Sequence, residues 1–296
     1  MVSTDTSASG RDVKTRHARF ARGIFLYPAM GYVIAFMVLP VAIIATYSFF
    51  QRGQYGGIVY SLTLDNFARA LDSLYVGILG TSVALSSTVT LLALLIGFPT
   101  ALAITKLQPQ HQNIALVLVI LPFWTNFLIR TYAWIVLLSS EGLLNQGLLG
   151  LGIISDPLAL LYTPGAVVMG LLYAYLPLMV LPIYAALSRI DPSLREAAID
   201  LGASRFTALR QVVFPLAIPG TLVGCVFVFV PSVGNFIVPE LLGGGKTVMV
   251  GNLIRDQFLK ARDWPFGSVL AIAMVVMLVL LFALQARITK RVLGQG

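Results

Sequence analysis

Residues 191–206 read Asp-Pro-Ser-Leu-Arg-Glu-Ala-Ala-Ile-Asp-Leu-Gly-Ala-Ser-Arg-Phe, a charged stretch between two long hydrophobic runs. Asp191 followed by proline predicts a helix start, because aspartate is a good N-cap and proline suits the first helical position. Small or branched apolar residues then recur at helical spacing on one face: Leu194, Ala197, Ala198 and Leu201. The stretch therefore predicts a short amphipathic helix at one side of a membrane.

A second short helix is predicted directly after the first. Gly202 falls where the first helix must end, since glycine readily takes the left-handed conformation of a helix C-terminus. Ser204 can cap the next helix, and Pro215 marks the entry to the following hydrophobic run. The apolar stripe of this second helix is Phe206, Leu209, Val212 and Val213. Such an elbow can lie on lipid headgroups, but its alanine-rich face is too small to bind a membrane well, so we favour docking against a protein partner.

The rest of the chain has the composition of a membrane protein. Of its 296 residues 58% are hydrophobic and only 11% charged, with a mean hydropathy of +0.89. About 20 apolar residues cross a bilayer as a helix. Six runs reach that length: Ile24–Phe50, Val76–Ile104, Asn113–Leu138, Pro164–Ser188, Leu216–Val238 and Phe266–Ala286. We predict an all-α polytopic membrane protein with six transmembrane helices, the first too long for a cleaved signal peptide.

The basic residues predict the orientation. With six spans both termini lie on one side, and most of the 20 lysine and arginine residues fall at the termini, in the elbow or in the short loops of that side. Positive charge resists translocation, so both termini and the elbow are predicted to be cytoplasmic. The net charge of +8 is then a topology signal and not a nucleic-acid site. The outer loops 51–75, 139–163 and 239–265 are predicted to pack as short interfacial helices or re-entrant segments.

The elbow carries a family resemblance. Glu196-Ala197-Ala198, followed by Gly202, Val212 and Phe214-Pro215, resembles the EAA signature of permease subunits in binding-protein-dependent ABC importers, with Val212 and Phe214 replacing Ile and Leu. The resemblance implies a type I ABC importer permease fold whose cytoplasmic coupling helix seats in a groove of a separate ATPase. The coupling residues it implies are Arg195, Glu196, Ala197, Ala198, Gly202 and Ser204.

Composition, the hydrophobic runs and the resemblance together divide the chain. The charged, Ser/Thr-rich start predicts a disordered cytoplasmic tail over residues 1–22, and the first run predicts a transmembrane helix with its outer loop over residues 23–75. The resemblance implies a five-helix core over residues 76–286 that contains the coupling elbow 191–213. Residues 287–296 form a cytoplasmic C-terminal tail.

Further tracts resemble the putrescine/spermidine permease branch: 121–130, 173–177, 239–244 and 262–266. They imply an importer subunit for polyamines or a related small organic cation in a bacterial inner membrane, although permeases for opines or amino-acid-like amines look similar. The implied partners are two ATPase subunits, a second homologous permease forming a heterodimer, a periplasmic or extracytoplasmic substrate-binding protein and membrane lipid. The chain itself is then no enzyme and holds no metal or cofactor, with ATP and Mg²⁺ on the partner ATPases.

Candidate pathway residues are aromatic, amide or charged side chains near the ends of the runs. The aromatic set offers π faces to an alkylammonium chain, although each ring suits an interfacial belt equally well: Trp124, Tyr132, Trp134, Tyr173 and Tyr175. Asn126 and Asn235 are amides at helix depth, and Glu240 is the acid best placed to meet an ammonium group. Arg130 lies within a run and can serve a helix end or pair with Glu141 or Glu240.

Other functional classes fit less well. Gly243–Thr247 ends like a phosphate-binding loop, but Glu240 stands where that motif needs a glycine, so a tight turn is expected there instead. A self-sufficient secondary transporter would need an acid within a span for ion coupling, and none is present. An intramembrane enzyme would need paired catalytic groups within spans, whereas His17 and His111 both lie outside them.

Overall fold

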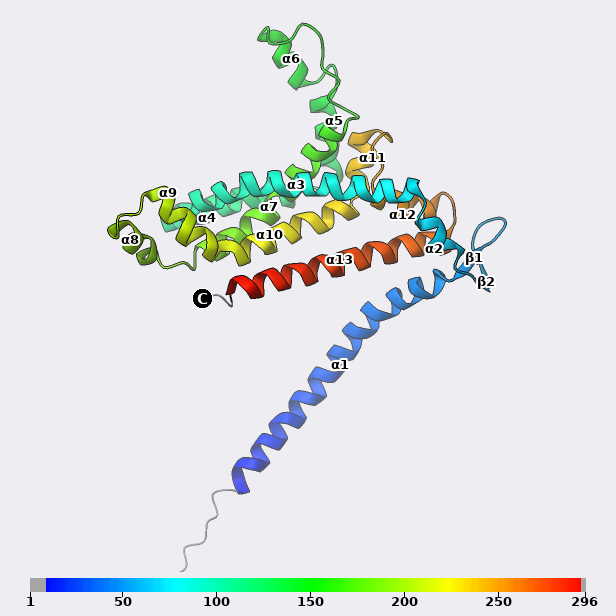
Figure 1. Cartoon of the computed structure of the whole chain (residues 1–296), viewed down its shortest axis with the longest axis horizontal. Helices are drawn as coiled ribbons and strands as arrows, with labels where there is room; N and C mark the ends of the chain where they lie inside the picture. The colour runs from blue at the N-terminus through cyan, green and yellow to red at the C-terminus, as the bar shows by residue number, and fades with distance from the viewer. Residues whose placement is uncertain (1–8, 294–296) are drawn as a thin grey trace, which may run out of the picture.

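Long apolar helices make up most of the computed structural model, which describes residues 9–293 (Figure 1). Within that range six segments are long and apolar enough to cross a membrane, which confirms the predicted fold class. They are Met30–Tyr47, Ser73–Thr105, Phe127–Gly150, Pro164–Leu187, Arg205–Gly234 and Trp264–Lys290.

The elements follow one another along the chain in a simple order. The first part runs through α1 (Ser9–Tyr47), β1 (Phe50–Arg52), β2 (Ile58–Leu62), α2 (Asp65–Ala70) and α3 (Ser73–Thr105). The middle comprises α4 (Pro109–Ile120), the 3₁₀ turn η1 (Leu121–Trp124), α5 (Phe127–Leu138), α6 (Leu143–Gly150) and α7 (Pro164–Leu187). The last part contains α8 (Pro192–Asp200), α9 (Arg205–Ala208), the π-helical turn η2 (Leu209–Val213), α10 (Phe214–Gly234), α11 (Ile237–Gly243), α12 (Val250–Leu259) and α13 (Trp264–Leu293).

The core is a three-helix unit of α3, α7 and α10, which pack against one another. Glycines allow the close approach, as in many membrane helix pairs. A Cβ at Gly97 of α3 would lie 2.8 Å from Met179 Cγ, and one at Gly224 of α10 would lie 2.9 Å from Met179 Sδ. Met179 itself is fully buried. This one flexible side chain of α7 therefore fills the space between both neighbouring helices.

The third hydrophobic run is not one helix, which corrects the expected span Asn113–Leu138. α4 ends at Ile120, η1 follows, and α5 starts at Phe127 and projects away from the bundle with α6 (Figure 1). Pro122 lacks a backbone N–H and disfavours continuation of the helix. Asn126 then caps α5 by accepting from the N–H groups of Leu128 at 2.8 Å and Ile129 at 3.4 Å.

The fifth run also differs from its predicted bounds Leu216–Val238. It begins earlier, because α9, η2 and α10 form one continuous helical segment from Arg205 to Gly234. Pro215 cannot donate to the carbonyl of Gln211, and the wider π turn directly before it accommodates that loss. The helix ends at Gly234, and α11 restarts the chain in a new direction after Asn235 and Phe236.

The terminal helices are longer than expected. α1 begins at Ser9, so residues 9–22 are helical where a disordered tail was predicted, while residues 1–8 lie outside the described residues. α13 likewise continues to Leu293 into the predicted C-terminal tail, and residues 294–296 are outside the described range. Both segments contain good helix formers, which favour continuation of the helix: arginine, lysine and alanine in residues 9–22, and arginine, lysine and leucine in residues 287–293.

The two ends of the bundle carry different structures. The elbow lies near the end of α13, and the hairpin, α2, α11 and α12 lie at the opposite end (Figure 1). The short helices confirm the expected packing of the outer loops, whereas the β1–β2 hairpin was not predicted.

An ion pair links α2 to the start of α13 at the hairpin end of the bundle. Arg69 of α2 lies 2.7 Å from Asp263, whose side chain is 1% exposed. Asp263 also accepts from the N–H of Phe266 at the start of α13.

Candidate coupling elbow and outer polar network

The first helix of the elbow starts as its sequence predicts. Asp191 is the N-cap of α8, and its Oδ1 accepts from the backbone N–H of Ser193 at 2.9 Å. This bond stabilises the charged carboxylate and lowers the pKa of Asp191 from its ordinary value. Pro192 occupies the first helical position, where its missing N–H costs nothing.

Gly202 ends α8 in a Schellman motif. Its φ is +91°, its N–H donates to Ile199 O at 2.9 Å, and the N–H of Ala203 donates to Ala198 O at 3.0 Å. This pair of bonds satisfies two carbonyls at the helix end and needs a left-handed residue between them. No atom lies within 4 Å of a Cβ built on Gly202, so the backbone conformation alone selects glycine.

Ser204 starts the second helix, again as predicted, because its Oγ accepts from the N–H of Thr207 at 3.1 Å. The second helix is not a separate piece, however, since it continues through η2 into α10. The elbow is thus one free helix, α8, joined by a glycine turn to the first turns of a membrane span.

The elbow presents an open apolar face to its surroundings. No residue of α8 is buried, Leu201 is 90% exposed and Phe206 is 71% exposed. Five of the six predicted coupling residues are exposed, and the sixth, Ala198, is half-buried: Arg195, Glu196, Ala197, Gly202 and Ser204. Among the residues whose side chains the structure describes, none forms a hydrogen bond or ion pair with the side chain of Arg195 or Glu196, so both charges face outward from the described fold.

Two of the pathway candidates meet at the break between α10 and α11. The amide nitrogen of Asn235 donates to the Tyr175 hydroxyl at 2.8 Å, and that hydroxyl lies 3.4 Å from Pro231 O. Asn235 Oδ1 accepts from the N–H of Val238 at 2.9 Å in the first turn of α11. The asparagine therefore both caps α11 and ties the break to α7.

Arg130 lies at the break in the third run, among aromatic rings. Its Nη1 donates to Pro122 O at 3.0 Å, so it satisfies a carbonyl at a helix end as one interpretation expected. Its guanidinium lies 5.6 Å from the Phe127 ring centre and 5.8 Å from that of Tyr173. The other interpretation, an acidic partner, is not what the structure shows, because among the described side chains neither Glu141 nor Glu240 pairs with Arg130.

The remaining candidates join this group only in part, through Tyr173. Trp124 is 77% exposed, Tyr132 is also exposed, and Asn126 is engaged in capping α5. Tyr173 packs edge-on against Trp134, with ring centres 5.6 Å apart. The structure thus gathers some of the predicted pathway residues near two helix breaks and leaves others on the surface of the single chain.

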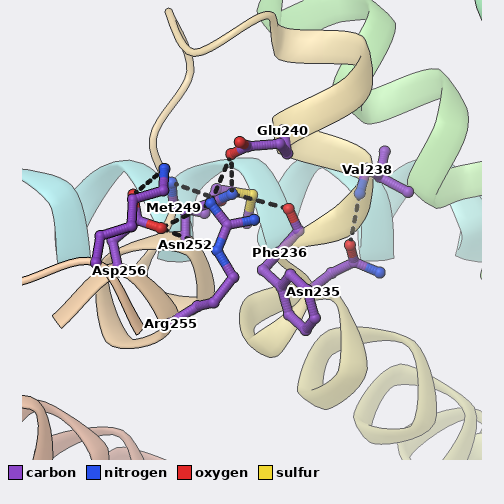
Figure 2. A network of polar contacts seen from close by, with 9 residues as sticks. Asn235, Phe236, Val238, Glu240, Met249, Asn252, Arg255 and Asp256 are labelled. Carbon is purple, nitrogen blue, oxygen red and sulfur yellow. Dashed lines mark hydrogen bonds and ion pairs between the residues drawn. The ribbon is translucent and has the colours of Figure 1, made fainter. Parts of the chain in front are cut away.

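Glu240 belongs to a network that the sequence did not reveal (Figure 2). Its Oε2 accepts from Arg255 Nη2 at 2.9 Å and lies 3.3 Å from the amide nitrogen of Asn252. Arg255 also forms an ion pair with Asp256 at 2.7 Å, and Lys260 pairs with the same carboxylate at 3.0 Å. Glu240, the acid predicted to meet an ammonium group, is therefore already paired with an arginine of this chain.

The network changes the pKa of Asp256 in the direction expected of a paired carboxylate. Burial acts to raise the pKa of Asp256, but the bonds from Arg255 and Lys260 outweigh it and the pKa is lowered. Asn252, which is buried, donates to Phe236 O at 2.8 Å and so fixes the residue at the break before α11. No sequence signal marks Arg255, because its partner lies 15 residues away across a turn.

The turn between α11 and α12 contains Lys246, within the stretch Gly243–Thr247 that ends like a phosphate-binding loop. Gly244 and Gly245 both have positive φ, at 58° and 74°, which confirms the expected tight turn after the fifth span. The turn directly follows the helix α11, whereas a phosphate-binding loop directly follows a strand.

Taken together, these features define a class of protein. A bundle of apolar helices long enough to cross a membrane, with an exposed, capped elbow at one end and polar helix breaks toward the other, has the architecture of a membrane permease. The chain belongs to the family of binding-protein-dependent transport system inner membrane components, whose model matches residues 17–294. It is a transport subunit of an inner membrane, and its family works with a separate ATPase and a substrate-binding protein.

Individual relatives and structures agree with this family. The chain is 40% identical to the spermidine/putrescine transport system permease protein PotB of Haemophilus influenzae, over 88% of this chain and 91% of that protein. PotB of Escherichia coli K12 is 40% identical over 88% of this chain and 95% of that protein. The crystal structure of a bacterial alginate ABC transporter with a pentasaccharide-bound periplasmic protein has a chain of the same fold. It matches with a TM-score of 0.73 and 19% identity, over 95% of this chain and 97% of that one.

Proposed function

We propose that this permease subunit imports putrescine, spermidine or a related small organic cation. The observation that carries the proposal is the 40% identity, over nearly all of both chains, to permeases named for spermidine and putrescine. The aromatic rings around the helix breaks and the Glu240 carboxylate supply the chemistry that an alkylammonium cargo needs, namely π faces and a negative charge.

The proposed assembly follows the family. A second, similar permease completes the pathway as a heterodimer, a binding protein delivers cargo at the end that carries α11 and α12, and two ATPase subunits dock on the elbows. Both termini and the elbow face the cytoplasm, and ATP and Mg²⁺ are bound by the ATPases. The exposed apolar face of α8, with Glu196 and Arg195 beside it, supports this docking.

The proposed mechanism is a shift between two access states. ATP binding closes the ATPases, which moves both elbows together and stabilises the state open to one side. Because nucleotide binds the two states with different affinity, its binding and hydrolysis shift the population between them.

The substrate is tested by uptake of radiolabelled putrescine and spermidine in a strain that lacks this chain. We expect uptake to be lost on deletion and restored by the wild-type chain. The Gly202→Trp variant should not restore it, because its side chain would enter the docking face and its backbone would need φ near +91°. Unchanged polyamine uptake in the deletion strain would show the assignment to be wrong.

A cargo with an acidic group is the second candidate. The observation that favours it is Arg130, whose guanidinium has no carboxylate partner in the described part of the chain. A cargo of amino-acid-like amine or opine type would offer a carboxylate to this group. If Arg130 serves such a cargo, an excess of opine will inhibit polyamine uptake in wild type and lose that inhibition in Arg130→Gln.

A further inference from the structure

Arg255 holds two carboxylates at once (Figure 2). Its Nη2 contacts Glu240 Oε2 at 2.9 Å, while its Nε and Nη2 contact Asp256 Oδ1 at 2.9 Å and 2.7 Å. Asp256 is the next residue in the chain after Arg255, and both lie on α12. The bond to Glu240 is the one that crosses from α12 to α11.

The bond across the helices is the more easily exchanged of the two. The Glu240 side chain is 42% exposed and that of Arg255 is 18% exposed, so solvent and small cations reach the glutamate first. An arginine that lost its only partner would be left with unpaired donors, which is costly. Here Arg255 would keep its two bonds to Asp256, so it can release Glu240 without becoming unpaired.

The position of Glu240 makes its partner important for transport. It lies in α11, directly after the break at Asn235 and Phe236. Asn252 links both features, because its amide donates to Phe236 O at 2.8 Å and lies 3.3 Å from Glu240 Oε2. Glu240 is thus held in the short helix α11 that follows a membrane span, with one carboxylate oxygen, Oε1, that makes no hydrogen bond to the described residues.

We propose that Arg255 is a specificity-determining residue that occupies, in the resting state, the position at Glu240 that an ammonium group of the cargo takes during transport. The guanidinium then remains on Asp256 while the ammonium binds Glu240. Cargo without a positive group cannot displace the arginine and is rejected. The inference rests on the proposed function, since it requires a cationic cargo.

The test uses the purified complex of permeases and ATPases without its binding protein, and radiolabelled spermidine as the probe in equilibrium binding. Arg255→Gln removes the internal competitor and should lower the Kd about two- to fivefold, the range that a partly exposed ion pair supports. Asp256→Asn leaves Arg255 with Glu240 alone and should raise the Kd by a similar factor. Glu240→Gln should raise the Kd most, by at least as large a factor.

The double variant Arg255→Gln/Asp256→Asn tests whether Asp256 affects spermidine binding through Arg255 or through its own negative charge. If Asp256 acts through Arg255, its substitution will have little effect once the arginine is gone, which is a coupling that a double-mutant cycle measures. Lys246→Gln is the matched control, because it removes a positive charge from the same loop region outside the network and should leave the Kd unchanged. If Arg255→Gln fails to fold, the opposite shift expected of Asp256→Asn still tests the inference.

Two results would overturn the inference and can be told apart. If the wild-type complex takes up and binds spermidine but Arg255→Gln binds it no more tightly, Arg255 is a structural residue and the proposed function stands. If deletion of the chain leaves spermidine uptake unchanged and the wild-type complex binds no spermidine, the proposed function fails and the inference fails with it.

Discussion

Glu196→Lys is expected to reduce uptake roughly tenfold or more without lowering the amount of the chain in the membrane. Glu196 is exposed, and its side chain makes no hydrogen bond or ion pair with the side chains that the structure describes, so the described fold loses no contact when its charge is reversed. An exposed side chain of this kind typically changes stability by about 0.5 kcal/mol or less. At a docking face, by contrast, a like-charge contact costs several kcal/mol, and about 1.4 kcal/mol already corresponds to a factor of ten.

The measurement combines uptake with recovery of the ATPase on the purified permease. Glu141→Lys is the matched control, because Glu141 is an exposed acid between α5 and α6, and those two helices lie far from α8 and α9 in Figure 1. It should leave both readouts unchanged. If Glu196→Lys transports and retains the ATPase like wild type, the elbow does not couple the two subunits through this residue.

Gly220→Val is expected to destabilise the chain by about 3 kcal/mol, at the upper end of the cost of overpacking. Gly220 of α10 faces α7 so closely that an added Cβ would meet the Cβ of Ala186 and would lie 2.7 Å from Pro182 O. A backbone carbonyl cannot move aside as a flexible side chain can. The two helices must therefore separate, and the contacts of the core between them are lost.

Thermal unfolding of the purified complex in detergent measures this effect, together with the level of the chain in membranes. Gly80→Val is the matched control, since Gly80 is also a helical glycine in a span and has no atom within 4 Å of an added Cβ. We expect Gly80→Val to unfold near the wild-type temperature. Equal melting temperatures for the two variants would contradict the close packing of α7 and α10.

The sequence predicted local features well because their causes are local. Asp191, Gly202 and Ser204 each act within a few residues, through caps whose geometry follows from residue type. The break in the third run also had a local signal in Pro122. Hydrophobicity over the whole run outweighed that signal, because a window of apolar residues does not register a change of helix direction.

The tertiary contacts could not be predicted in the same way. Arg255 reaches Glu240 only because α12 folds back toward α11, and Arg69 reaches Asp263 across 194 residues. Arg130 was recognised as unusual, but whether an acid would approach it depended on how α5 leaves the bundle. Such pairings are set by the packing of whole helices, which neither spacing nor composition encodes for a single sequence.

The continuous helix that joins the elbow to α10 is a lever. It comprises 30 residues from Arg205 to Gly234, and at 1.5 Å per residue it is about 45 Å long. A tilt of about 5° about its elbow end would displace the other end by about 4 Å at that length. The far end of this helix meets Asn235, which leads into α11 and Glu240. A tilt of this size at the elbow would therefore move Asn235 by a distance comparable to the size of an ammonium group.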